Sequence, residues 1–418
     1  MSVAFSGVFR SLRNYNYRVW SAGALVSNVG TWMQRTAQDW LVLTQLTHHS
    51  ASAVGVVMAL QFGPQLLMLP WSGFAADHFN QRKLLFATQA ALGMLALALG
   101  LLTIAGIVQL WHVYVFAFLS GCTAAFDAPV RQTFVTELVG DADLVNAVAL
   151  NSTSFNGARM IGPAVAGLAI ASIGTGWSFI VNGLSYAAVL ISLLCLRSAE
   201  LRPIARAHRA KGSFSDGVRY VWSRPDLKAI LFMLFLIGTF GLNFPIFIST
   251  MAVRVFHTGA GGYGMLSSMM AVGTVAGALI GAGLDKPRFG ALLVGAAFFG
   301  LGCASAAIAP DYWLFATALV VTGAAVLTIT TTTNALMQLS TEPAMRGRVM
   351  ALRLAIALGG TPIGAPIVGW VADEFGPRWA LGAGAASGVA AAFVAAYAMI
   401  KKRHRQRSAE FGDPHEML

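Results

Sequence analysis

The sequence has few charged residues for its length. Lys, Arg, Asp and Glu make up 11% of its 418 residues, whereas a soluble globular protein carries roughly a quarter. Hydrophobic residues reach 56%, and the mean hydropathy is +0.67. This composition excludes an ordinary soluble domain and predicts a protein that lies mostly within a membrane.

Cysteine is also scarce, and no recognisable catalytic or metal-binding spacing occurs. Cys122, Cys195 and Cys303 all lie in apolar stretches, where free cysteine behaves as a small hydrophobic residue. We find no histidine-rich metal cluster, no nucleophile–base spacing and no phosphate-binding loop. The sequence therefore predicts neither an enzyme nor a bound cofactor or metal.

The long apolar runs predict helices that cross the membrane. A spanning helix needs about 20 mostly apolar residues, and the runs lack the alternation of a membrane strand. No removable signal peptide is expected, because no short apolar core with a cleavage site follows the polar N-terminus. About twelve spans are predicted, near residues 18–43, 52–76, 83–106, 112–135, 144–172, 178–197, 227–252, 261–284, 289–309, 312–338, 349–371 and 379–400.

The net charge of +11 is explained by topology rather than by nucleic acid. Of the 28 Lys and Arg, only Arg254 and Arg378 lie between spans on the side opposite the N-terminus, and Arg35, Arg131 and Arg159 lie deep within spans. Basic loops stay in the cytoplasm. We therefore expect a multi-pass protein of the bacterial inner membrane with both termini in the cytoplasm.

The predicted fold is all-α, with two pseudo-symmetric six-helix bundles. The central basic stretch could attract acidic lipid headgroups, but the topology rule alone explains its charge. The expected parts are an N-terminal cytoplasmic tail 1–17, a first bundle 18–197, a basic cytoplasmic linker 198–226, a second bundle 227–400 and a C-terminal cytoplasmic tail 401–418.

Glycine and tryptophan recur at matching points of the two halves. A duplicated set of spans with the substrate site between the copies is typical of secondary transporters. Gly162, Gly167, Gly174 and Trp177 recur in step as Gly364, Gly369, Gly376 and Trp379, and Gly73 and Asp77 are echoed by Gly281 and Asp285.

Polar residues within spans are costly and often mark a transport pathway. The candidates for the substrate or proton pathway are Arg35, Asp39, Asp127, Arg131, Asn156, Arg159, Asn243 and Asn334. Asp127 and Arg159 are expected at similar depth, where they could pair. Mutually neutralising structural ion pairs are the alternative, but three arginines against two aspartates leave one cation unmatched.

Other residues are candidates for a conformational gate. Proline bends a helix, and glycine allows helices to approach closely; a turn with an acid and a basic pair could form a charge latch. The candidates are Gly162, Pro163 and Gly167 in one bend, Gly364 and Pro366 in another, Gly73, Asp77, Arg82 and Lys83 in the turn, and Gly281 and Asp285 in its copy.

From end to end, the chain resembles the major facilitator superfamily. The turn from Gly73 to Lys83 resembles the superfamily's signature loop, with His78 where arginine is usual and Asn80 where glycine is usual. A closer resemblance is to the enterobactin-exporter-type branch, the transmembrane secretion effectors. Its pattern is carried by Trp32-Met33-Gln34, Asp127-Ala-Pro129-Val-Arg131-Gln132, Asn146 to Asn151, Asn156, Arg159, Gly162 and Pro163.

The resemblance implies efflux of a small molecule driven by the proton gradient. Asp39 and Asp127 are the in-span carboxylates available to carry a proton, and Arg35 and Arg159 could hold an anionic, siderophore-like group. The expected partners are a small-molecule substrate, protons and the lipid bilayer, for a monomer that binds no nucleic acid. The alternatives are a multidrug/proton antiporter of broad specificity and a non-transporting membrane receptor or assembly factor.

Overall fold

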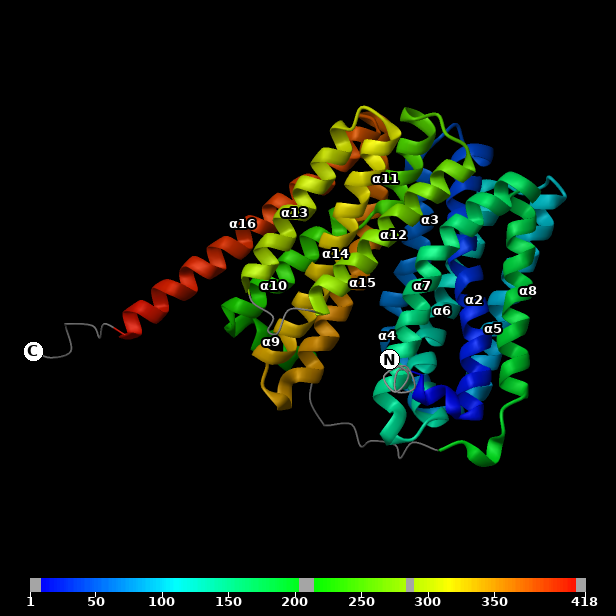
Figure 1. Cartoon of the computed structure of the whole chain (residues 1–418), viewed down its shortest axis with the longest axis horizontal. Helices are drawn as coiled ribbons and strands as arrows, with labels where there is room; N and C mark the ends of the chain where they lie inside the picture. Colours follow the sequence, from blue (N-terminus) through cyan, green and yellow to red (C-terminus); the bar gives the residue numbers. More distant parts are fainter. Residues whose placement is uncertain (1–8, 203–213, 283–288, 411–418) are drawn as a thin grey trace, which may run out of the picture. The chain divides into compact units, whose positions relative to one another are not determined.

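The computed structural model describes residues 9–202, 214–282 and 289–410, and within these ranges every regular element is a helix (Figure 1). The all-α prediction is therefore confirmed. The outermost parts of both predicted tails, residues 1–8 and 411–418, and the linker stretch 203–213 lie outside the described residues.

The first half of the chain contains six predicted spans, and each falls on helix. The helices are η1 (Arg10–Arg13), α2 (Tyr15–Leu41), η2 (Val42–Leu46), α3 (Ala51–Leu67), α4 (Leu69–His78), α5 (Gln81–Ile104), α6 (Leu110–Leu138), α7 (Asp141–Ile173), α8 (Thr175–Leu194) and η3 (Ser198–Glu200). The predicted span 52–76 is two helices that meet at Met68. Pro70, in the first turn of α4, has no N–H with which to continue the hydrogen bonding of α3.

The second half also places its predicted spans on helix. The helices are α9 (Phe214–Ser223), α10 (Pro225–Leu236), η4 (Ile237–Gly241), α11 (Phe244–Thr250), η5 (Met251–Val255), α12 (Ala260–Ala282), α13 (Phe289–Ile308), α14 (Tyr312–Ser340), α15 (Pro343–Glu374) and α16 (Pro377–Glu410). The π-helical segment η4 interrupts the predicted span 227–252, and η5 begins at its end and extends it to Val255. Helix α16 continues into the predicted tail as far as Glu410.

Eight helices of the described residues are long and apolar enough to cross a membrane, and α3 is a shorter apolar helix. The predicted spans on α2, α7 and α12 are not in this set. Helices α2 and α7 carry Arg35, Asp39 and Arg159, which lower their hydropathy. The set nevertheless includes α6, which carries Asp127 and Arg131, so candidate pathway residues lie on helices of both kinds.

The described chain forms two compact units. The first comprises Met1–Arg209, Pro245–Ser268 and Ala365–Asp373; the second comprises Ala210–Phe244, Met269–Gly364 and Glu374–Leu418. In the first unit α2 packs on α7 and α8, α5 packs on α8, and α3 packs on α6. In the second, α13 packs on α14 and α16. The division into bundles at residues 198–226 stays a prediction.

The repeated glycines have equivalent positions in the two halves. A Cβ atom on Gly162 would meet Trp32 in the first helix of the first half, and one on Gly364 would meet Thr239 in η4, in the first span of the second half. Five residues further along α7 and α15, Gly167 approaches Ala260 of α12, and Gly369 approaches Ala51 of α3. The duplication seen in the sequence is thus matched by the helix contacts.

The same correspondence holds at the ends of α7 and α15. Gly174 and Gly376 have φ angles of 87° and 101°, a left-handed conformation that favours glycine at a helix end. Trp177 and Trp379 follow on exposed positions of the next helix. The second repeat, of Gly73 and Asp77 with Gly281 and Asp285, is incompletely described, because Asp285 and the side chain of Asp77 lie outside the described residues.

Capping side chains fix several helix starts. Ser50 accepts a hydrogen bond from the Ala53 N–H at the start of α3, and Asn80 accepts one from the Lys83 N–H at the start of α5. Serine and asparagine are preferred caps because their oxygens satisfy free N–H groups of the first turn. Asn80 is one of the two departures from the signature loop, and capping α5 gives that residue a structural role.

The orientation in the membrane is a prediction that reporter fusions test. We expect a reporter fused after Leu418, and one inserted after Ala205 as a control, to be active only on the cytoplasmic side, because the basic loops are retained there. A reporter inserted after His48 should behave as periplasmic. Cytoplasmic activity of the His48 fusion would contradict the twelve-span topology.

Candidate functional site

Two arginines from different helices lie over one tryptophan ring. The guanidinium carbon of Arg35 on α2 is 4.8 Å from the Trp32 ring centroid, and that of Arg159 on α7 is 5.3 Å from it. Such distances allow attraction between each cation and the ring. Because both lie over one ring, the two guanidinium carbons are at most about 10 Å apart.

Further aromatic rings complete this arginine–aromatic cluster, which consists of Trp32, Arg35, Phe62, Phe155 and Arg159. Phe155 packs edge-on against Trp32 at 5.7 Å, and the Arg35 guanidinium also lies 5.4 Å from the ring centre of Phe62 on α3. The cluster therefore joins α2, α3 and α7 within the first unit.

Gly162, which has no side chain, lets α7 approach α2 closely enough for Arg159 to join the arginine–aromatic cluster. Gly162 lies one turn after Arg159, and a Cβ atom there would collide with Trp32. Without that atom, α7 approaches α2 at the level of the indole ring. Pro163 follows directly inside α7, and it removes the N–H that would bond to the Arg159 carbonyl. The predicted bend motif thus positions the predicted pathway arginine.

The two arginines of the cluster form no close ion pair with a described acid, although the charges of Arg35 and Asp39, one turn apart on α2, attract each other. Neither Arg35 nor Arg159 takes part in an ion pair with a described residue. Arg159 is exposed and Arg35 is half-buried as whole residues, while their guanidinium groups lie among aromatic rings. Arginine suits recognition of carboxylate and similar oxyanions, because its planar fork donates two parallel hydrogen bonds.

Asp39 lies one turn beyond Arg35 on α2 and is 7% exposed. The Tyr263 hydroxyl of α12 lies 3.3 Å from Asp39 Oδ2, and the Tyr263 ring stacks on Trp40 at 6.1 Å. All three residues belong to the first unit. Among the described residues no hydrogen bond joins Arg35 to Asp39, because the arginine lies on aromatic rings instead.

Asp127 has a different environment from Asp39. It accepts hydrogen bonds from Thr88 Oγ1 at 2.8 Å and Gln89 Nε2 at 2.6 Å, and from Arg131 Nε at 3.2 Å. Arg131 also donates to Asn28 Oδ1 at 3.1 Å. The expected pairing of Asp127 with Arg159 is therefore wrong: the partner of Asp127 is Arg131, one turn along the same helix.

The predicted asparagines are divided between the two units. Asn156 is exposed on α7, one turn before Arg159, and its amide donates to the Ser152 carbonyl at 2.8 Å. Asn243 and Asn334 belong to the second unit. Asn243 is fully buried and donates to the Thr239 carbonyl at 2.7 Å, while Asn334 is half-buried on α14.

The structure gives part of the turn between α4 and α5. Gly73 is half-buried on α4 and Lys83 is exposed. Arg82 donates to Ser198 Oγ at 2.7 Å and to the Leu194 carbonyl at the end of α8 at 3.4 Å. These two hydrogen bonds connect the turn to the C-terminal end of α8 and to Ser198, which follows it. A latch through Asp77 stays a prediction.

Several residues of the site were not identified from the sequence. Thr88 and Gln89 read as ordinary polar residues of an apolar helix, and Tyr263 as one of eight tyrosines. Trp32 belongs to the family pattern. Its position three residues before Arg35 could have predicted their contact, since residues at this spacing share a helix face. Tyr263 gave no comparable signal, because only the fold brings it to Asp39.

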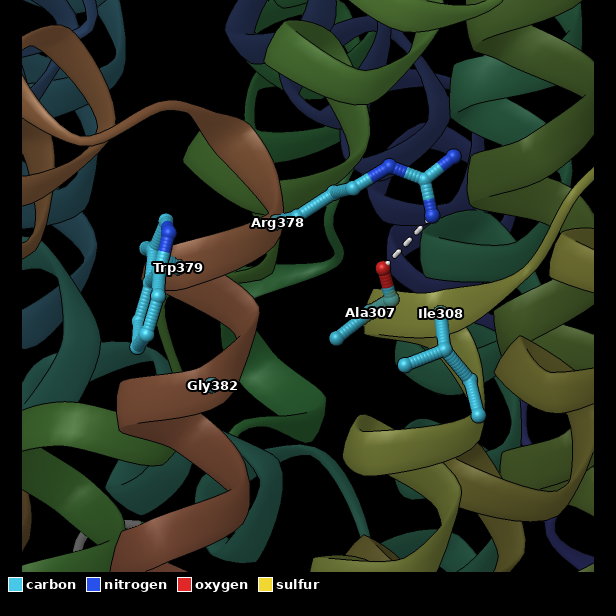
Figure 2. Close-up of a pocket in the computed structure, with 5 residues that line it drawn as sticks. All are labelled: Ala307, Ile308, Arg378, Trp379 and Gly382. Carbon is cyan, nitrogen blue, oxygen red and sulfur yellow. Dashed lines mark hydrogen bonds between the residues drawn. The ribbon is translucent and has the colours of Figure 1, made fainter.

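A shallow pocket of about 400 Å³ lies in the second unit (Figure 2). Its lining includes Ile308, Arg378, Trp379 and Gly382, and the Arg378 guanidinium donates to the Ala307 carbonyl at 2.8 Å. That carbonyl belongs to the last turn of α13, so Arg378 caps a helix end. The pocket holds none of the predicted pathway residues.

Comparison with known proteins identifies the family. The family profile described as transmembrane secretion effector matches residues 6–416, nearly the whole chain. The chain belongs to the transmembrane secretion effector family. This is a branch of the major facilitator superfamily, and its members are transporters. The resemblance drawn from the Trp32, Asp127 and Arg159 motifs is confirmed.

Individual relatives are distant and differ in cargo. The staphyloferrin A transporter of Staphylococcus aureus is 25% identical over 60% of this chain and 63% of its own length, so the chain spans less than two thirds of that relative. The multidrug efflux pump Tap of Mycolicibacterium fortuitum is 25% identical over 84% and 88%. The enterobactin exporter EntS of Escherichia coli is 24% identical over 78% and 79%.

Solved structures show the same fold. The nucleoside transporter NupG gives a TM-score of 0.70 at 14% identity, covering 92% of this chain and 99% of that one. A bacterial homologue of the lysosomal transporter Spinster gives 0.68 at 15% identity, covering 92% and 95%. The expected architecture of about twelve helices is therefore confirmed as the major facilitator fold.

Proposed function

We propose that this protein is a secondary active exporter that moves a small anionic or amphipathic molecule out of the cell by alternating access, in exchange for protons. The observation that carries the proposal is the pair of guanidinium groups on Trp32, neither of which is ion-paired with a described residue. A cation within a membrane is costly unless water or an anionic ligand solvates it.

The geometry of the cluster favours a cargo that combines anionic groups with flat or apolar parts. Two guanidinium forks on separate helices can each bind a carboxylate or catecholate group of one molecule. Trp32, Phe62 and Phe155 offer ring surfaces beside them. Siderophores and related compounds have this chemistry, and two relatives carry siderophore names.

Asp39 is the proposed carrier of the coupling proton. Its described partner is a hydroxyl, which can donate to an ionised carboxylate and accept from a protonated one. Asp39 therefore keeps a hydrogen bond in both protonation states. Asp127 has three donors and one of them is a guanidinium, so protonating Asp127 would break an ion pair.

A multidrug/proton antiporter is the second candidate. The aromatic rings around Trp32 and the similarity to the efflux pump Tap support it. Many broad-specificity pumps carry lipophilic cations, however, and two unpaired guanidinium groups would repel a cation. The charge of the cargo therefore distinguishes the two candidates.

Transport in vesicles tests the proposal. We expect inverted membrane vesicles containing the protein, acidified inside, to take up an anionic catecholate or tricarboxylate compound and to release protons, as read by a pH-sensitive dye. Vesicles without the protein and vesicles given an uncoupler are the controls. Proton release with ethidium but with no anion would favour the multidrug function instead.

The remaining expectations belong to the same proposal. We propose a monomer in the cytoplasmic membrane with both termini in the cytoplasm, and the distribution of basic residues supports this orientation. A non-transporting receptor is the least supported alternative, since the three relatives described above are transporters or pumps.

A further inference from the structure

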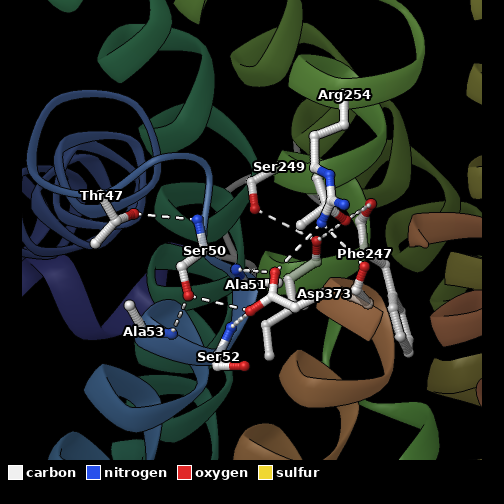
Figure 3. A network of polar contacts seen from close by, with 12 residues as sticks. Thr47, Ser50, Ala51, Ser52, Ala53, Phe247, Ser249, Arg254 and Asp373 are labelled. Carbon is white, nitrogen blue, oxygen red and sulfur yellow. Dashed lines mark hydrogen bonds and ion pairs between the residues drawn. The ribbon is translucent and has the colours of Figure 1, made fainter. Parts of the chain in front are cut away.

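The carboxylate of Asp373, at the end of α15, binds the beginning of α3 (Figure 3). Oδ1 accepts from the Ala51 N–H at 2.8 Å, and Oδ2 accepts from the Ser52 N–H at 2.8 Å and from Ser50 Oγ at 3.1 Å. A guanidinium N–H of Arg254 completes the set at 3.3 Å from Oδ1. We call these residues the Asp373 clamp; all belong to the first unit.

The clamp satisfies backbone groups that a helix leaves unpaired. The first N–H groups of an α-helix have no partner inside it. Ser50 accepts only from the Ala53 N–H, and the Ala51 and Ser52 N–H groups go to Asp373. The helix dipole adds to the attraction, because a carboxylate is favoured at the N-terminal end.

Arg254 connects the clamp to a third segment. The same guanidinium nitrogen donates to the Ala372 carbonyl at 2.9 Å and to Asp373. The Ala372 carbonyl is in the last turn of α15, where carbonyls also lack helical partners. One arginine and one aspartate thus satisfy the end of α15 and the start of α3 together.

Close backbone contact continues along both helices from the clamp. A Cβ atom on Gly369 would collide with the backbone of Ala51 and Ser52, and one on Gly55 would collide with the backbone of Ala365. The last three turns of α15, from Ala365 onward, therefore lie directly on α3. At this end of the first unit, α3 and α15 leave no room for a solute between them.

Helix α15 is shared between the two units. Its residues up to Gly364 belong to the second unit, and Ala365 to Asp373 belong to the first. The bend motif with Gly364 and Pro366 lies at this division. A transporter with alternating access must open each end of its pathway in turn. Opening this end therefore requires α15 to part from α3.

The clamp is suited to repeated opening. The side chains of Asp373 and Arg254 are 24% and 29% exposed, whereas that of Asp127 is 9% exposed. Water can therefore replace the bonds to Asp373 when the helices part. We propose that Asp373 is a positioning residue that holds this end of the pathway closed, and that its bonds to α3 break when the end opens.

The proposal rests on alternating access, and so on the proposed transport function, but its test measures conformation directly. Spin labels are placed on His48 and Gly261, both exposed, in a background with Cys122, Cys195 and Cys303 replaced. A side chain at Gly261 meets no neighbour within 4 Å. The distance between the labels, measured by pulsed electron resonance on purified protein in detergent, reports opening of this end.

We expect a dominant short distance in the parent and a several-fold larger long-distance fraction in Asp373→Ala. Asp373→Asn should behave similarly, because its NH₂ group cannot accept from a backbone N–H. The neighbouring acid supplies a matched control, and Glu374→Gln should leave the distribution unchanged. Maximal transport rate should fall in both Asp373 variants, while the apparent affinity for cargo measured by equilibrium binding should not.

An unchanged distance distribution in folded Asp373→Ala and Asp373→Asn would overturn the proposal. Failure of both variants to yield monodisperse protein would also overturn it, because a reversible clamp is dispensable for folding. A shifted distribution in a protein that moves no cargo would uphold the clamp and reject the proposed transport function instead.

Discussion

Arg159→Ala is expected to weaken binding and transport of an anionic cargo roughly 10- to 100-fold while leaving the protein folded. Arg159 is an exposed residue whose guanidinium lies on the Trp32 ring, and no ion pair with a described residue depends on it. Loss of a charge-assisted hydrogen bond to cargo costs about 1.5–3 kcal/mol, or roughly 10- to 100-fold in binding. Direct binding and vesicle uptake, each normalised to the amount of protein, measure the effect.

Three variants sharpen this experiment. Arg35→Ala should resemble Arg159→Ala, since Arg35 lies on the same indole ring. Arg159→Lys keeps the charge but loses the flat fork, so we expect an intermediate affinity. Arg219→Ala removes an exposed charge on α9 and should have no effect. Normal uptake by Arg159→Ala would remove the arginine–aromatic cluster from the cargo pathway.

The helices were predictable because each span is a long apolar run, which has few alternatives in a membrane. Their interruptions were less predictable. The predicted span 227–252 contains one π-helical segment, Ile237–Gly241, and ends in another, Met251–Val255; apolar composition reveals neither. The repeated glycines predicted helix contacts correctly, because two helices that approach this closely leave no room for a side chain. Gly162 and Gly364 could not be replaced without collision.

The sequence identified individual residues of the candidate site but not which of them are in contact. The free-energy cost of placing a charge within a membrane span identified four residues as unusual: Arg35, Asp39, Asp127 and Arg159. Depth along a helix does not give the direction in which a side chain points, so Asp127 was assigned the wrong partner. The Asp373 clamp was missed because its acid lies at a helix end, where charge is common, and its donors are mostly backbone N–H groups.

Asp127→Ala is expected to be the most destabilising substitution of an in-span charge. It would leave Thr88 and Gln89 without their acceptor and the Arg131 guanidinium without its ion-pair partner. Breaking a buried ion pair from one side costs about 3–5 kcal/mol. We expect lower abundance and a lower midpoint of thermal unfolding in detergent than for Asp39→Ala, since the described partner of Asp39 is one tyrosine hydroxyl.

The double variant Asp127→Ala/Arg131→Ala should recover part of this stability, because the stranded guanidinium is gone. Asp127→Asn keeps an acceptor for Thr88 or Gln89 and should retain proton-coupled transport, whereas Asp39→Asn should lose the coupling. The reverse result would make Asp127 the proton carrier. No recovery in the double variant would mean that the cost arises from the bonds to Thr88 and Gln89. The ion pair with Arg131 would then contribute little, and the neutral donors would be what fixes Asp127 in place.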